Sequence, residues 1–110
     1  MLDAFRRLRD RYPEYLFAFS AGEFFLFVLG DAHRLVELLP DLRIERALSG
    51  YDSVRVHKLD IFTLGARLLA KGQKVALVAR KTSSAGRTYY EIMYRTEDPV
   101  VGKRMEGGVA

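Results

Sequence analysis

The stretch FAFSAGEFFLFVLGDA, residues 17–32, constrains the fold of this chain more than any other segment. Eleven of its sixteen residues are apolar, and it holds five of the seven Phe in the sequence. Aromatic and β-branched runs favour strands, so YLFAFS and EFFLFVL predict two strands. Gly22 lies between them and can adopt the positive φ that a short hairpin turn usually requires. The second run is apolar on both faces, which predicts a strand inside a sheet.

Helices are predicted on both sides of this hairpin. Phe5, Leu8 and Tyr12 share one face of residues 2–12, and Pro13 ends that helix because the residue before a proline avoids helical dihedrals. Asp31 is predicted to cap a second helix that ends before Pro40. Its apolar face carries Ala32, Leu35, Val36 and Leu39.

The second half of the sequence predicts a β-α-β unit over residues 53–79 with a right-handed crossover. LRIERAL and SVRVHKL alternate in part and predict two short strands. Asp60 is expected to cap a third helix that ends at Lys71-Gly72, and KVALVA reads as a buried strand. The third helix carries Ile61, Leu64, Leu68 and Leu69. RTYYEIMYR predicts a last strand with Tyr90, Ile92 and Tyr94 on one face.

These elements predict an α/β fold: a single domain over residues 1–101, with a mixed sheet of about five or six strands flanked by about three helices. Residues 102–110 are expected to form a flexible C-terminal tail.

Composition narrows the class of protein. No window of 18 apolar residues lacks charges, which argues against a membrane span, and the charged N-terminus is unlike a secretory signal peptide. There is no Cys, so disulfides and thiolate metal sites are excluded, and we expect a cytoplasmic protein. The net charge of +4, with 13 Arg, suits an anionic partner. The absence of Asn and the single Gln fit a heat-adapted source or a GC-rich genome.

LRDRYPEYLFAFSAGEFFLFVLGDAHRLVELL, followed by LLAKGQKVALV, resembles the N-terminal mismatch-recognition domain of the MutS DNA mismatch repair family. The resemblance runs from about residue 2 to residue 96, with GEFF, the Asp31-Ala32 helix start and KGQKVAL in the family's order. It implies a mixed sheet surrounded by helices and a Phe-x-Glu motif that contacts a mispaired base. The family's later clamp, lever and ATPase domains have no counterpart, so no repair signalling is expected from this chain alone.

Carried over by position, the family's stacking Phe falls on Phe24 and its Glu falls on Leu26, which cannot accept a hydrogen bond. Glu23 stands where the family has Asp, and Ser20 where it has Arg. The resemblance thus implies an aromatic wedge at Phe24. An ordinary core position remains the alternative for this ring.

Basic residues form the second candidate site. The residues Arg55, His57 and Lys58 precede the third helix, where the family approaches DNA. A second group, Arg80, Lys81 and Arg87, flanks TSSAG, a loop that we expect to be flexible and able to follow a phosphate backbone. The alternative is that all of these are ordinary solvated charges at strand ends.

No enzymatic activity, metal or cofactor is expected. A nuclease on such a sheet usually needs an acidic cluster with a Glu-x-Lys step, and no Glu here is followed by Lys two residues later. His33 and Glu37 share one helix, but two ligands do not make a metal site.

Two functions therefore stay open. The first is a non-catalytic DNA-binding protein that contacts duplex or distorted DNA through Phe24 and the basic residues. The second is a protein-interaction module, an accessory factor or inhibitor of a larger nucleic-acid enzyme. A homodimer through an edge strand is compatible with either.

Overall fold

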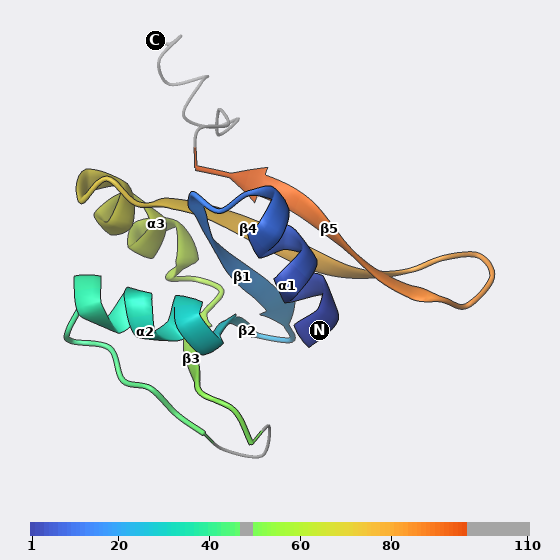
Figure 1. The fold of residues 1–110 in the computed structure, drawn as a ribbon, viewed down its shortest axis with the longest axis horizontal. Coiled ribbons are helices and arrows are strands. Elements are labelled where there is room, and N and C mark those ends of the chain that lie inside the picture. The colour runs from blue at the N-terminus through green and yellow to red at the C-terminus, as the bar shows by residue number, and fades with distance from the viewer. Residues whose placement is uncertain (47–49, 97–110) are drawn as a thin grey trace, which may run out of the picture.

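The computed structural model describes residues 1–46 and 50–96 as one α/β domain, a five-stranded mixed sheet with three helices, which confirms the predicted fold class (Figure 1). The elements are α1 (Leu2–Arg11), β1 (Tyr15–Ala21), β2 (Phe24–Val28), α2 (Leu29–Leu38), β3 (Ser53–His57), α3 (Ile61–Ala70), β4 (Lys74–Thr82) and β5 (Thr88–Arg95). The strand order is β3-β2-β1-β4-β5, in which only β1 and β4 pair in parallel. None of the helices in the described ranges has both the length and the apolar character that crossing a bilayer would need. The predicted tail at 102–110 lies outside the described residues.

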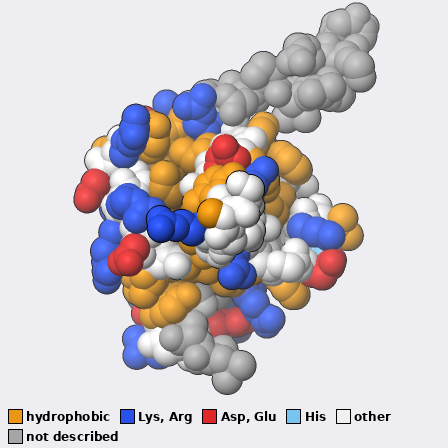
Figure 2. Space-filling view, turned by 90° about the vertical axis from the view of Figure 1, so that its right-hand side faces the viewer, with side chains coloured by type: hydrophobic (Ala, Val, Ile, Leu, Met, Phe, Trp, Pro, Cys, Tyr) orange, Lys and Arg blue, Asp and Glu red, His pale blue; other side chains and the backbone are white. Residues whose placement is uncertain are grey.

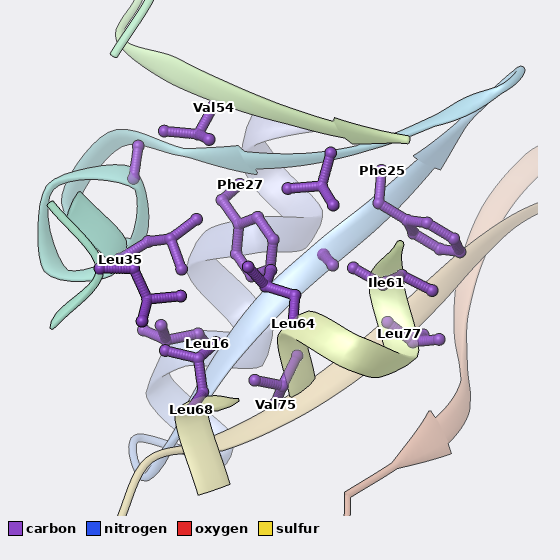
Figure 3. Packing of buried hydrophobic residues seen from close by; sticks show 14 residues of the cluster. Leu16, Phe25, Phe27, Leu35, Val54, Ile61, Leu64, Leu68, Val75 and Leu77 are labelled. Carbon is purple, nitrogen blue, oxygen red and sulfur yellow. The ribbon is translucent and has the colours of Figure 1, made fainter. Parts of the chain in front are cut away.

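Side chains alternate along each strand, so the sheet builds one core on each face. On one face, α2 and α3 cover a cluster that includes Leu16, Phe25, Phe27 and Val75. Figure 3 shows Phe25 and Phe27 pointing from β2 toward the helical side chains. On the other face, α1 supplies Ala4 and Phe5 to a cluster that includes Phe17, Phe19 and Val28.

The hairpin predicted at residues 15–29 is confirmed. Phe19 pairs with Leu26 and Ala21 with Phe24, and Gly22 takes a φ of 64° in the turn. The second strand of the hairpin, β2, lies between β1 and β3, so its interior position is also as predicted.

The carboxylate of Asp31 does not cap α2, so that prediction was wrong. The residue lies inside the helix, its side chain is fully buried, and the N-cap is Val28. The carboxylate accepts a hydrogen bond from the Phe17 amide at 2.9 Å and another from the Arg9 guanidinium. The described pairs of β1 with β2 involve only Phe19–Ala21, so Asp31 occupies a strand edge that β2 leaves open.

The strand predicted for LRIERAL does not form over residues 42–46, where a single bridge between Glu45 and Ser53 is found. Residues 47–48 lie outside the described ranges. Leu42 and Ile44 of this segment pack against the α2/α3 core, so their apolar side chains are partly buried without strand pairing.

The crossover from β3 through α3 to β4 joins parallel strands, but these strands are not neighbours because β2 and β1 lie between them. At the end of α3, the Gln73 amide donates to Leu68 O and the Gly72 amide to Leu69 O. This is a Schellman cap, and Gly72 has the φ of 81° that it requires. The predicted helix end is therefore confirmed, although Leu69 itself is exposed.

On β5, the expectation that Tyr90, Ile92 and Tyr94 share a face was wrong. Tyr90 and Ile92 pack in the α1-side cluster, whereas Tyr94 packs against the α2/α3 cluster. Leu77 pairs with Tyr94 and Val78 with Ile92, so Met93 is the extra residue of a β-bulge. The inserted residue breaks the two-residue alternation and turns Tyr94 to the opposite face.

Candidate nucleic-acid interface

Phe24 lies on the sheet face that carries α1, outside both hydrophobic clusters and half-buried. The next residue, Phe25, is 7% exposed and packs in the α2/α3 core, as strand alternation predicts. Of the two adjacent rings, Phe24 therefore lies at the surface and Phe25 in the core.

Two side chains from β3 contact the Phe24 ring. The Arg55 guanidinium carbon lies 4.9 Å from the ring centroid, and the His57 ring meets Phe24 edge-on at 5.5 Å between centroids. The antiparallel register explains this, because Phe24 pairs with His57 and Leu26 pairs with Arg55. A guanidinium over an aromatic face is held by the quadrupole of the ring.

Acidic neighbours balance the positive charges of Arg55 and of the nearby Lys58. Glu45 Oε1 accepts a hydrogen bond from Arg55 Nε at 3.1 Å, and Glu23 Oε2 lies 3.3 Å from Lys58 Nζ. Both pairs are solvent-exposed, so each is a weak interaction that an external anion can replace. Sequence reasoning missed both partners. Glu23 stands beside the hairpin turn and could have been found there, whereas nothing in the local pattern points to Glu45.

The second basic group lies on a hairpin arm, formed by residues 80–90 of β4 and β5, which projects from the sheet (Figure 1). Arg80 and Lys81 are strand residues rather than loop residues, and Arg87 immediately precedes β5. All three side chains are exposed. Lys81 lies 3.6 Å from Glu91, whereas neither Arg80 nor Arg87 forms an ion pair with any described residue.

Hydrogen bonds close the turn of the arm, at the loop TSSAG that the sequence predicts to be flexible. The Ser83 amide donates to Arg87 O at 2.8 Å, and the Gly86 amide donates to Ser83 O at 2.9 Å. The Ser83 hydroxyl accepts a third bond from the Arg87 amide. The arm therefore has a defined shape at its tip.

Strand register brings the two groups to one end of the sheet. Phe24 lies beside Ala21 of β1, and Phe19 pairs with Val78, so the arm begins at the level of the hairpin turn. Arg80 is two residues beyond Val78 and shares its face, which is also the face of Phe24. Lys81 points to the opposite face. Figure 2 looks along the arm and shows Lys and Arg side chains around this end, with fewer Asp and Glu.

His33 and Glu37, the two side chains considered as metal ligands, each interact with a different residue instead of with each other. His33 Nε2 lies 2.6 Å from Asp52 Oδ2, and Glu37 accepts a hydrogen bond from Arg34. The pKa of Asp52 is held below its usual value by hydrogen bonds, first from Arg46 and then from His33. Within residues 1–46 and 50–96, no three His, Cys, Asp or Glu side chains form a cluster that could hold a metal ion.

No protein-family model matches this sequence, and no curated protein matches it at a significant level.

Proposed function

We propose that this protein is a non-catalytic DNA-binding protein that lays the Phe24–Arg55 pair against the bases and the arm against the phosphate backbone. The observation that carries the proposal is the outward Phe24 ring with a guanidinium over it, because aromatic and guanidinium planes are the two protein groups that stack on unpaired or distorted bases. The resemblance of GEFF and its surroundings to the MutS mismatch-recognition domain supports the same use of this ring.

The proposed contact at the bases is a wedge. Inserting an apolar ring between base steps costs a few kcal/mol of unstacking, and this cost is smallest at a mismatch. Leu26 lies on the same face two residues further along β2 and can add apolar contact but no hydrogen bond. We therefore expect recognition of distortion rather than of a particular base.

The proposed phosphate contacts come from Arg55, Lys58, Arg80, Lys81 and Arg87. Arg80 and Arg87 are unpaired among the described residues, so they can bind phosphates without first breaking a salt bridge. The exposed Arg55, Lys58 and Lys81 would exchange a carboxylate for a phosphate.

Fluorescence anisotropy with matched, mismatched and branched duplexes tests the proposal. We expect binding to all three below about 100 µM at low salt, tightest for the distorted duplexes, and steep weakening with added salt. Phe24→Ala should remove the preference for distorted DNA. The matched control is Phe62→Ala, an exposed ring on α3 on the opposite side of the sheet. No binding to any duplex at low salt would refute the proposal.

The second candidate, a protein-interaction module, is favoured by one observation that lies away from Phe24. The described residues include five large exposed hydrophobic side chains, and three of them belong to α3 or the residue before its cap: Leu59, Phe62 and Leu69. This surface does not depend on the DNA-binding proposal.

A further inference from the structure

The arm is a two-stranded ribbon that leaves the sheet (Figure 1). The last described pair of β1 with β4 is Phe19 with Val78, so only β4 and β5 continue together beyond this point. Their pairing runs without a break as far as Thr82 and Thr88, next to the hydrogen-bonded turn. The arm is therefore a ribbon of defined shape that is one sheet thick.

The charge of the arm has one sign and appears on both of its faces. The arm holds three of the 18 Lys and Arg residues of the chain and none of its 14 Asp and Glu residues. Arg80 pairs across the ribbon with Tyr90, which packs in the α1-side cluster, so Arg80 projects from that face. Lys81 projects from the opposite face with its partner Tyr89, and alternation along β5 places Arg87 there too. This arrangement suits a partner that presents negative charge on two sides of the ribbon.

We propose that the arm enters the major groove of duplex DNA tip first, with its two faces toward the phosphates that border the groove. This placement rests on the proposed function, in which duplex DNA is the partner. A sheet with its side chains is about 10 Å thick, which fits the major groove, about 12 Å wide, but not the minor groove, about 6 Å wide. Proteins that open the minor groove commonly insert a large apolar side chain between base steps, and the tip, Ser84-Ala85-Gly86, has none.

The spacing of the cations along the arm agrees with the depth of the major groove. Arg80 and Lys81 precede Ser84 by four and three residues, which at about 3.3 Å per strand residue is roughly 10–13 Å. The groove is about 8.5 Å deep, so a tip at the base edges leaves both cations at the rim, where the phosphates lie. The Ser84 hydroxyl and the Ala85 methyl group are small enough to approach the bases. A lone hydroxyl and a methyl group discriminate little among base pairs, so we expect weak sequence preference.

Filling the major groove tests this placement. Fluorescence anisotropy at low salt compares two duplexes of one matched sequence, one of which carries glucosylated 5-hydroxymethylcytosine, whose sugars occupy the major groove. We expect the glucosylated duplex to bind at least about tenfold more weakly, because the sugars exclude the arm. Netropsin, which fills the minor groove of A·T tracts, should weaken binding much less than the sugars do.

A carboxylate at the tip shows whether the arm itself is what the sugars displace. Ala85→Glu should weaken binding to the unmodified duplex at least about fivefold and change binding to the glucosylated duplex little. The matched control is Ala66→Glu, an exposed Ala on α3, which Figure 1 shows far from the tip of the arm. This control should affect both duplexes alike. Circular dichroism must show that both variants remain folded.

The possible outcomes separate the groove placement from DNA binding itself. Equal affinity for the two duplexes, or an equal effect of Ala85→Glu on both, would overturn the placement and leave the proposed function intact. A larger effect of netropsin than of the sugars would also overturn it, because the protein would then occupy the minor groove. Absence of binding to either duplex would overturn the proposed function and the groove placement together.

Discussion

The two neighbouring rings at positions 24 and 25 have opposite environments, and their substitution should separate surface from core. Phe25 is 7% exposed, so Phe25→Ala should lower the free energy of unfolding by about 3–5 kcal/mol through lost burial and the cavity left behind. Phe24→Ala removes a half-buried ring beside Arg55 and should cost about 1 kcal/mol, by the smaller apolar area lost. Urea unfolding of the two variants measures both values. Equal losses would contradict the outward orientation of Phe24.

Asp31 should make stability depend on pH. Burial raises the pKa of this carboxyl above the usual 3.8, and the hydrogen bond from the Phe17 amide and the Arg9 charge offset only part of that effect. The folded protein therefore keeps a proton that the unfolded chain releases. The stabilisation from protonated Asp31 is complete below pH 3.8 and is lost as the pH rises through the higher folded-state pKa.

Asp31→Asn provides the measurement, because Asn keeps an oxygen for the Phe17 amide but does not titrate. The difference in unfolding free energy between parent and variant, measured in urea from pH 4 to 7, should move in favour of the parent as the pH falls. Parallel pH profiles would show that Asp31 titrates alike in the folded and unfolded states.

Sequence reasoning left open whether Phe24 is a surface wedge or a core residue, and it did not predict the role of Asp31. Alternation along a strand is local, so the buried Phe25 fixes the opposite direction for Phe24. The position of Asp31 before an apolar helical face matches an N-cap, but the helix begins two residues earlier. Its partners Phe17 and Arg9 are 14 and 22 residues away, a distance at which sequence pattern carries no signal.

Gly72, just after α3, and Gly30, within α2, have different backbone conformations, so replacing each by Ala should change stability in opposite directions. Gly72 caps α3 at a φ of 81°, where any side chain is strained, so Gly72→Ala should destabilise the protein by about 1–2 kcal/mol although nothing crowds the site. Gly30 lies within α2 without a positive φ, and its Cβ would approach Arg9 Nη1 no closer than 4.0 Å. Gly30→Ala should therefore stabilise by up to about 1 kcal/mol. Thermal unfolding of both variants tests the pair, and a stable Gly72→Ala would contradict the assigned cap.

Side-chain periodicity in the sequence predicts some of the strands correctly and others not. The hairpin was predictable because its turn chemistry and both strands are adjacent in the sequence. The segment LRIERAL alternates in part, but its described portion makes only the Glu45–Ser53 bridge and packs Leu42 and Ile44 against the α2/α3 core instead. The bulge at Met93 follows from pairing with β4, so the reversal of Tyr94 could not be read from β5 alone.

At the scale of the whole molecule, the arm should contribute part of the salt dependence of the proposed DNA binding. If Arg80 and Arg87 each contact one phosphate, replacing both by Ala should lower the slope of log affinity against log salt by roughly 2. The matched control is Arg43→Ala, an exposed Arg that follows α2, away from the arm. Anisotropy titrations at several salt concentrations give the slopes. Equal slopes for the arm variant and the parent would remove the arm from the interface.

The basic residues of the candidate site could be picked out from the sequence, but their arrangement in space could not. The cations were visible in the sequence, whereas the contact between Arg55 and Phe24 depends on the register of β2 with β3. The separation of Arg80 and Lys81 onto opposite faces depends on their lying within β4 rather than in a loop. Carboxylate partners such as Glu45 reach the site only through tertiary structure.

The parallel pairing of β1 with β4 has a consequence for synthesis of the chain. Phe17, in the central strand, needs Ala76 as its neighbour, so the amino-terminal half cannot finish its sheet until the ribosome has made β4. At translation rates of about 5–20 residues per second, the nascent hairpin waits roughly 3–12 seconds for that partner, with its phenylalanines open to chaperones. Completion of the sheet therefore follows the synthesis of its amino-terminal half by several seconds instead of accompanying it.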